Sequence, residues 1–245
     1  RRPDTLGLGR SATLSLGRSA TIIAMASDEY TGDVKVGGPA AVRELPGLRI
    51  TKIAVGPYDN NAYLLRCTTT GDTMLIDAAA EPDRLLAARA DGLLVSVVTT
   101  HQHPDHWQAL EAVVGVTGPA VIAHPLDAVG LPIPMTETVV DGDVLAVGDA
   151  QVKVIHLKGH TPGSIALVYD WDSAAPHIFT GDSLFPGGPG NTRKNVADFT
   201  SFMDDLEAKV FGVLPDATWV YPGHGGDTTL GAERPHLSEW RERGW

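Results

Sequence analysis

From residue 49 onward, the pattern of apolar and polar positions predicts alternating strands and helices. Short apolar runs bounded by turn residues predict strands, and apolar positions three or four residues apart predict helices. We expect strands at 48–55, 62–66, 74–77, 93–100, 120–123, 144–147, 152–156, 165–169, 177–180 and 219–221. We expect helices at 81–89, 107–114, 201–214 and 236–243. This order favours an α/β fold with two sheets, each covered by helices.

Two segments show how the pattern distinguishes the elements. Residues 93–100 form a continuous apolar run, which is typical of a strand buried on both faces. Residues 201–214 are apolar at helical spacing only, which predicts an amphipathic helix. Asp59-Asn60-Asn61, between the first two strands, has turn chemistry. No G-x-G-x-x-G follows the first strand, which argues against a Rossmann fold.

The first 40 residues lack this pattern and are set apart. Residues 8–13 (Leu-Gly-Arg-Ser-Ala-Thr) recur as residues 16–21, and four arginines but only one acid precede Met25. Such a stretch is similar to a transit presequence, but we favour translated upstream sequence with the natural start at Met25. We expect residues 1–40 to be a disordered or non-native N-terminal extension, and residues 41–245 to form a single domain.

Composition narrows the classes of function. The chain has 245 residues, 43% hydrophobic and 20% charged, which is typical of a globular protein. Its net charge of −11 argues against nucleic acid or an anionic membrane as a partner. No apolar stretch approaches the ~18 residues that a membrane span needs. Cys67 is the one cysteine, expected in the core, so cysteine-rich zinc motifs are excluded. We expect a cytoplasmic protein, and its oligomeric state stays open.

Residues 101–106 carry the strongest chemical signal. The sequence His-Gln-His-Pro-Asp-His places three imidazoles and a carboxylate directly after the strand expected at 93–100. Imidazole and carboxylate are the side chains that hold zinc, manganese and iron. Packing them so closely has no simple structural reason, because each polar group must be solvated or paired. The cluster is therefore predicted to bind metal.

Four further polar residues share one placement, in a turn just after an expected strand. They are Asp77, His160, Asp182 and His224. Loops at strand ends are where a rigid scaffold presents functional groups. With the 101–106 cluster, three of these residues bring the total to five imidazoles and two carboxylates, more than a single catalytic zinc uses. Such a set suits two ions that share a bridging carboxylate and a bridging hydroxide. Asp77 suits a carboxylate that orients a ligand.

These motifs, in this order, resemble those of the metallo-β-lactamase fold superfamily, and Asp77 matches its first motif. The resemblance covers about residues 49–225. It implies an αββα four-layer sandwich, with the metal site at one edge of the two sheets. It also implies that the first metal is bound by His101, His103 and His160, and the second by Asp105, His106 and His224, with Asp182 bridging them.

The sequence around these motifs is similar to the glyoxalase II branch, which hydrolyses acyl-glutathione thioesters. The segments concerned are 159–164, 181–185, 222–224 and 228–234. The resemblance implies a binuclear metal hydrolase in which a metal-bridging hydroxide attacks a small acyl thioester or ester. Asp105 and Asp182 would be the catalytic carboxylates, and the two divalent ions would be zinc, or iron or manganese. Several β-lactamases have cysteine at the position of Asp182, so β-lactamase activity is not expected.

Three departures weaken the expectation of glutathione itself. Residues 187–191 are Gly-Gly-Pro-Gly-Asn, where typical glyoxalase II enzymes have Gly-Gly-Cys-Gly-Lys. Asn191 therefore replaces the glutathione-contacting lysine, and Gly226 replaces a tyrosine. We also expect no helical C-terminal substrate domain, so short one-domain glyoxalase II-like hydrolases are expected to be a closer match. Arg193 and Lys194 are candidate cations on the substrate loop.

Other functions stay open. Persulfide dioxygenases with a single iron have similar ligands, but residues 185–188 do not match the Arg-Gly-x-Gly-Arg-Thr-Asp-Phe run of those enzymes. Lactone or ester hydrolysis by the same fold is a further alternative. A non-catalytic binding module would be expected to have lost a ligand, and none is missing. Of the other histidines, we expect a core position or hydrogen bonding for His156 and a surface position for His177 and His236.

Overall fold

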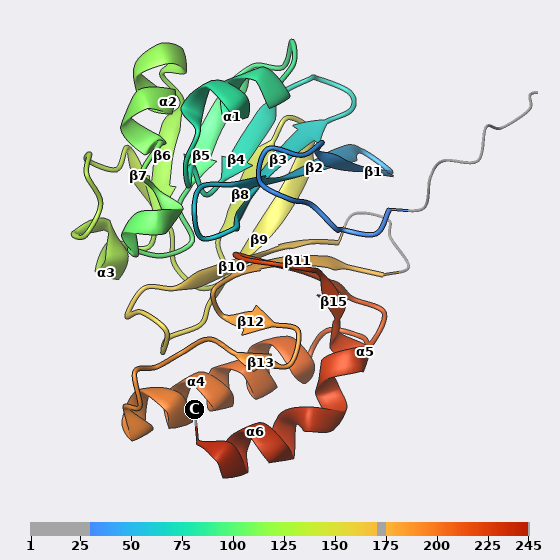
Figure 1. Ribbon diagram of the computed structural model, residues 1–245, viewed down its shortest axis with the longest axis vertical. Coiled ribbons are helices and arrows are strands. Elements are labelled where there is room, and N and C mark those ends of the chain that lie inside the picture. Colours follow the sequence, from blue (N-terminus) through green and yellow to red (C-terminus); the bar gives the residue numbers. More distant parts are fainter. Residues whose placement is uncertain (1–29, 171–174, 245) are drawn as a thin grey trace, which may run out of the picture.

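The computed structural model describes residues 30–170 and 175–244. Two large sheets lie face to face, and helices cover the outer face of each (Figure 1). This arrangement confirms the α/β class and the four-layer αββα sandwich. None of the described helices is long and apolar enough to cross a membrane.

The first sheet has seven strands in the order of the sequence. They are β1 (Ala41–Leu45), β2 (Leu48–Val55), β3 (Asn60–Cys67), β4 (Thr73–Ile76), β5 (Leu94–Val98), β6 (Ala120–Ala123) and β7 (Glu137–Thr138). Strands β1 to β4 are antiparallel, whereas β4 to β7 are parallel. Helices α1 (Pro82–Ala88) and α2 (Leu110–Thr117) pack on its outer face. The short helices η1 (Pro104–His106) and α3 (Pro125–Ala128) follow β5 and β6.

The second sheet has the order β15-β14-β11-β10-β9-β8. Its strands are β8 (Val144–Val147), β9 (Ala150–His156), β10 (Ile165–Tyr169), β11 (His177–Gly181), β14 (Trp219–Pro222) and β15 (Thr228–Thr229). A small hairpin, β12 (Leu184–Phe185) and β13 (Gly188–Pro189), follows β11. The outer face is covered by α4 (Val196–Asp205), its π-helical continuation η2 (Leu206–Phe211), α5 (Leu230–Glu233), η3 (Arg234–His236) and α6 (Leu237–Arg243).

The core between the two sheets explains the uninterrupted apolar runs. In β10, Leu167 and Tyr169 point into the inter-sheet core, and Ala166 and Val168 point toward the helices. Both faces of the strand are therefore buried, so every position favours an apolar residue. Cys67 is buried in the same inter-sheet core, as expected.

The C-terminal half of the chain departs from the expected helix at 201–214. Helix α4 begins at Val196 instead, because the Asn195 side chain accepts hydrogen bonds from the backbone N–H groups of Ala197 and Asp198. Asparagine is among the best residues at this capping position. The helix then widens into the π-helical η2 turn from Leu206.

Residues 30–40 also differ from the expectation of an extension that ends at residue 40. The Tyr30 ring packs against Trp219 and Tyr221, and its hydroxyl donates to Asp227 at 3.0 Å. Lys52 Nζ donates to the carbonyl of Gly32 at 2.8 Å. The folded part therefore includes residues 30–40, ahead of the boundary expected at residue 41. The remainder of that segment, 1–29, lies outside the described residues.

Candidate metal centre

Loops from both sheets meet at one edge of the sandwich. The 101–106 cluster follows β5, and Asp182 and His224 follow β11 and β14. His160 lies in the turn between β9 and β10. The carbonyl of Thr100 accepts the N–H of Ile165 at 2.9 Å, so the cluster is tied directly to the second sheet. The expected meeting of distant strand ends is therefore what the structure contains.

All seven predicted ligands lie together at this edge. Three groups of ligand atoms each fall within 4.8 Å of one another. The first group matches the predicted first metal site and the third matches the second, while the middle group joins them. The groups are His101, His103 and His160; His101, His106 and Asp182; and Asp105, His106 and His224.

Asp182 occupies the position between the two outer groups. Its Oδ2 lies 3.6 Å from His160 Nε2 and 3.5 Å from His224 Nε2. Its Oδ1 lies 3.3 Å from His106 Nε2. One carboxylate thus faces ligands of both groups, which is the placement that a bridging role requires.

Two glycines allow this close approach. A Cβ atom at Gly223 would lie 2.2 Å from Asp182 Oδ1, and one at Gly190 would lie 1.8 Å from the Asp182 carbonyl oxygen. Any other residue at either position would displace the Asp182 carboxylate or its backbone. Glycine is therefore required where two loops close around the site.

Asp77 lies behind the predicted ligands, as expected for a carboxylate that orients one of them. Its Oδ2 lies 2.9 Å from His106 Nδ1. The same carboxylate accepts the N–H and the hydroxyl of Thr100, both at 2.8 Å. Asp77 is buried and has a positive φ of 57°, a conformation that aspartate tolerates better than most residues. With Nδ1 of His106 on this carboxylate, Nε2 of the same ring lies toward Asp182, 3.3 Å from its Oδ1.

Backbone oxygens orient two of the other rings in the same way. His160 Nδ1 lies 2.9 Å from the carbonyl of Asn191, and His224 Nδ1 lies 2.8 Å from the carbonyl of Tyr58. A carbonyl oxygen only accepts, so each Nδ1 carries the proton and each Nε2 is left with a lone pair. That is the tautomer a metal ligand needs at Nε2.

The charges divide the site into two halves. Burial lowers the pKa of His101 well below its usual range, and it also lowers the pKa of His160. Burial acts in the same direction on His106, but the Asp77 and Asp182 carboxylates outweigh it and raise its pKa to about 10. Burial alone would raise the pKa of Asp182, but the neighbouring imidazoles hold that pKa below its usual range. The first group is therefore neutral, and the second carries charge.

One buried atom tests whether a cation fits. Among the described residues, His101 Nε2 is buried and has no hydrogen-bond partner. It lies 4.0 Å from Asp182 Oδ2. A buried polar atom without a partner is costly, and a metal ion between this nitrogen and the carboxylate would satisfy it. The donor set of five imidazoles and two carboxylates therefore fits divalent ions such as zinc, iron or manganese.

The residues that support the site were not all apparent from the sequence. Asn60 and Asn61 were expected in a turn, yet both are buried at the start of β3. Asn60 Nδ2 donates to Asp105 Oδ2 at 3.0 Å, and Asn61 Nδ2 donates to the carbonyl of Pro222 at 2.9 Å. The sequence signal for this supporting role is the pair of adjacent asparagines at the start of a buried strand.

Asp127 is a second supporting residue that the sequence analysis missed. It lies in the short helix α3 and is 1% exposed. Its carboxylate accepts the N–H of Gln102 at 3.0 Å, the N–H of Gly163 at 2.7 Å and the hydroxyl of Thr161. It thus joins the 101–106 cluster to the turn that carries His160.

The remaining histidines only partly match expectation. His156 lies 2.9 Å from the carbonyl of Pro162, so its expected hydrogen bonding is confirmed, and His236 is exposed. The surface position expected for His177 is wrong. It is 4% exposed and lies 3.0 Å from the hydroxyl of Tyr221, because β11 is an inner strand of its sheet.

The loop that carries the candidate cations lies next to the first group. Arg193 Nη2 is 3.0 Å from His103 Nε2, and Asn191 Oδ1 accepts the N–H of Arg193 at 2.6 Å. Lys194 is exposed on the same loop. A cavity of about 490 Å³ opens here, with His103, His160 and Arg193 in its wall.

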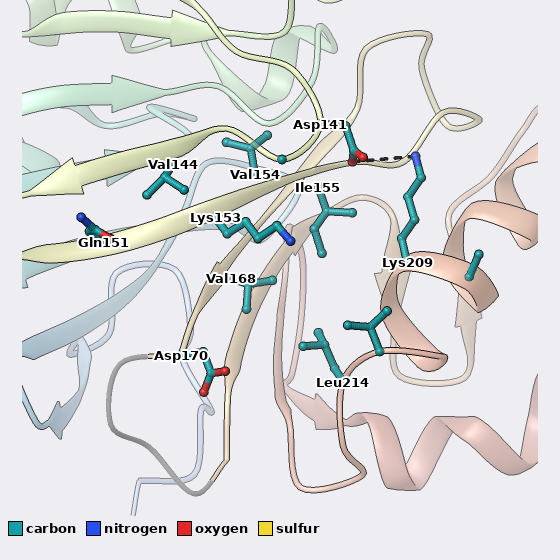
Figure 2. Close-up of a pocket in the computed structure, with 13 residues that line it drawn as sticks. Asp141, Val144, Gln151, Lys153, Val154, Ile155, Val168, Asp170, Lys209 and Leu214 are labelled. Carbon is teal, nitrogen blue, oxygen red and sulfur yellow. Dashed lines mark ion pairs between the residues drawn. The ribbon is translucent and has the colours of Figure 1, made fainter.

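A second cavity, of about 500 Å³, lies away from the predicted ligands, between β9, β10 and η2 (Figure 2). Lys153 projects from β9 toward it, near Val168. Asp141 and Lys209 form an ion pair of 3.8 Å at its edge. No predicted ligand lines this cavity.

Fold and site together define an αββα protein with a dense histidine and aspartate centre at the sheet edge. Residues 55–224 match the metallo-beta-lactamase superfamily, and the chain belongs to that superfamily. A hydroxyacylglutathione hydrolase of Rhodospirillum rubrum is 36% identical over 178 residues, which cover 72% of this chain and 66% of that protein. The chain therefore spans just under two thirds of the length of that relative.

Solved structures agree with this assignment. TTHA1623 in a di-iron-bound form is 32% identical, with a TM-score of 0.63 over 75% of this chain and 96% of that chain. ETHE1 from Myxococcus xanthus is 29% identical, with a TM-score of 0.67 over 79% of this chain and 84% of that chain.

Proposed function

We propose that this protein is a hydrolase that binds two divalent metal ions and cleaves acyl thioesters. The proposed ligands are the seven residues of the metal centre, with Asp182 shared between the two ions. Asp105 and Asp182 would be the catalytic carboxylates, and Asp77 would orient His106.

The observation that carries this proposal is the placement of Asp182 between two complete sets of donors. Its two oxygens lie within 3.6 Å of His106, His160 and His224, which belong to different groups. A site for one ion would leave Asp105 and His224 without a role. TTHA1623, which is 32% identical, was solved in a di-iron-bound form, and this supports two ions here.

Two divalent ions in this centre would lower the pKa of a water molecule toward neutrality and so supply the nucleophile. The protein's own contribution is orientation and charge. Asp77 holds the His106 ring, Asn60 holds the Asp105 carboxylate, and the Asn191 carbonyl holds His160. Loss of such a hydrogen-bond partner commonly lowers metal affinity or activity about 10- to 100-fold.

The choice of a thioester is supported by the R. rubrum relative, whose name, hydroxyacylglutathione hydrolase, describes cleavage of an acyl thioester. It is also supported by the sequence around His160 and Asp182.

The test is a comparison of wild type with Asp182→Ala. Metal content is measured by elemental analysis, and turnover is measured on S-lactoylglutathione, other acyl thioesters, a lactone and glutathione persulfide. We expect the variant to retain at most one ion and to lose thioester turnover. Asp170→Asn, which removes an exposed carboxylate far from the site, is the matched control.

Each outcome of this screen separates the candidates. Two ions and thioester cleavage support the proposal. Oxygen uptake on glutathione persulfide with one iron would replace it with a dioxygenase, and cleavage of the lactone alone would replace it with a lactonase. An unchanged Asp182→Ala variant would refute the bridging role.

A further inference from the structure

The cavity beside the first group of ligands has the size and position of a substrate site. Its volume of about 490 Å³ falls within the range of roughly 300–1,000 Å³ for small-molecule sites. His103 and His160 form one wall, and Lys158, Arg193 and Asp198 lie around the rest. A molecule that reacts at the metal centre therefore has room here for the part that does not react.

The charge of this cavity is opposite to that of the chain. Two cations, Lys158 and Arg193, line it against one acid, Asp198, whereas the whole chain carries −11. Both cations are exposed, and neither forms an ion pair within the described ranges 30–170 and 175–244. The chain's overall charge would repel an anionic ligand, so a local excess of cations indicates where such a ligand binds.

Arg193 lies where it could contact both the metal centre and a ligand in the cavity. Its Nη2 lies 3.0 Å from His103 Nε2, on the side of the ring away from the Nδ1 contact with His160. A guanidinium carries five N–H donors, so Arg193, which lines the cavity, has donors beyond this contact. An oxyanion in the cavity would accept from those donors.

Asn191 contacts both Arg193 and the predicted ligand His160. Its side chain accepts the N–H of Arg193, and its carbonyl faces His160 Nδ1. The Asn191 side chain therefore fixes the backbone from which Arg193 reaches the wall of the cavity.

We propose that Arg193, assisted by Lys158, binds an oxyanion on the thiol half of the substrate, so that anionic thioesters are preferred over neutral ones. This rests on the thioester hydrolase function proposed above. The guanidinium suits either a carboxylate or a phosphate, because both present paired oxygens.

The test uses two thioesters that differ only in charge, S-acetyl-3-mercaptopropionate and S-acetyl-3-mercaptopropionamide. Wild type is expected to have the lower KM for the anion. Arg193→Gln should raise that KM about tenfold and raise the KM of the amide much less. Lys158→Gln should act in the same direction by a few-fold, and Arg193→Lys should recover part of the loss. Lys153→Gln, in the remote cavity of Figure 2, should change neither KM.

Phosphate and carboxylate are separated by S-acetyl-4′-phosphopantetheine and its dephosphorylated form. A larger Arg193-dependent difference for this pair than for the propionate pair would assign the oxyanion as a phosphate, and a smaller one as a carboxylate. Equal KM changes for the anionic and the neutral member of both pairs would overturn the proposal.

A binding measurement keeps this inference separate from the proposed function. 3-(Methylthio)propionate and its amide carry a thioether in place of the thioester, so neither offers the bond that is cleaved. Each is titrated calorimetrically into the metal-loaded wild type and Arg193→Gln, with metal content recorded. Arg193-dependent binding of the anion without any thioester turnover would refute the hydrolase and leave the anion site standing. Turnover with no such discrimination would refute only the anion site.

Discussion

At the scale of single residues, the clearest dependence is that of His106 on Asp77. The Asp77 carboxylate is buried and lies 2.9 Å from His106 Nδ1. Asp77→Ala would leave that nitrogen without its partner and free the ring to rotate. We expect metal affinity at the second group to fall about 10- to 100-fold, measured by competition with a chelating dye.

The control for this variant is Asp83→Ala, which removes an exposed carboxylate in the first turn of α1. It should leave metal affinity unchanged. If Asp77→Ala bound both ions as tightly as wild type, His106 would not depend on Asp77 for its orientation.

The two groups of ligands should also respond differently to pH. The pKa of His106 is raised to about 10, so at pH 7.5 its ring is protonated and a metal must displace that proton. Burial lowers the pKa of His101 and of His160, so those rings are already neutral. Affinity at the second group should therefore rise as pH increases from 7 toward 10, while affinity at the first stays flat.

Calorimetry at pH 7.5 in two buffers of different ionisation enthalpy measures the released protons. We expect the second ion to release more protons than the first, because its histidine ligands His106 and His224 both have raised pKa values. Equal proton release in both steps would contradict the difference between the groups.

At the scale of elements, a buried ion pair joins β2 to the loop that carries His224. Lys52 and Asp227 are both almost fully buried, with Nζ and Oδ1 2.6 Å apart. Lys52 Nζ also donates to the carbonyl of Gly225 at 2.8 Å, next to His224. Lys52→Met would leave the Asp227 charge buried without its partner, so we expect a loss of about 3–5 kcal/mol in the free energy of unfolding.

Urea denaturation of Lys52→Met, Asp227→Asn and the double variant measures this coupling. The double variant should lose less than the sum of the single variants, because the second change removes the stranded charge. Additive losses would indicate that the two side chains do not depend on each other.

Helix α3 offers a second element-scale prediction. Asp127→Ala would remove the acceptor that links Gln102 to Thr161 and Gly163. His103 and His160 would then lose their common support. We expect the first ion to be bound at least tenfold more weakly while the second changes little, measured by metal titration. Asp143→Ala, on an exposed turn, is the control, and a change confined to the second ion would contradict this assignment.

At the scale of the whole molecule, the sequence predicted what depends on local pattern. The inner strands β5 and β10 are long apolar runs, and the predicted ligands follow strand ends. The sequence pattern did not predict strand β7, because Glu137 and Thr138 are exposed and gain strand geometry only by pairing with β6. The contact of Asn60 with the metal centre was not predicted for a related reason, since its partner Asp105 is 45 residues away. Such roles come from tertiary contact, which no local pattern encodes.

The same long-range closure makes metal a determinant of overall stability. The predicted ligands extend from residue 101 to residue 224 and meet only in the folded chain. Ions held by the complete set therefore bind the native state more tightly than the unfolded chain and stabilise it by mass action. At a free metal concentration 1,000 times Kd, each ion should contribute about 4 kcal/mol. Removal of metal with EDTA should lower the melting temperature, and zinc, iron or manganese should restore it.

His224→Ala separates this effect from a general response to chelator. The first group of ligands is intact in His224→Ala, so this variant should keep part of the metal-dependent shift in melting temperature. Asp182→Ala should keep less of the shift, because the Asp182 carboxylate faces both groups. The shift is measured by calorimetry with and without EDTA. A melting temperature of wild type that does not change on complete removal of metal would mean that the loops are held by protein contacts alone, such as those of Asp77 and Asp127. In that case the centre would already be formed without metal. The buried His101 Nε2, which has no hydrogen-bond partner, would then lower the stability of the metal-free protein, and metal binding would remove that penalty.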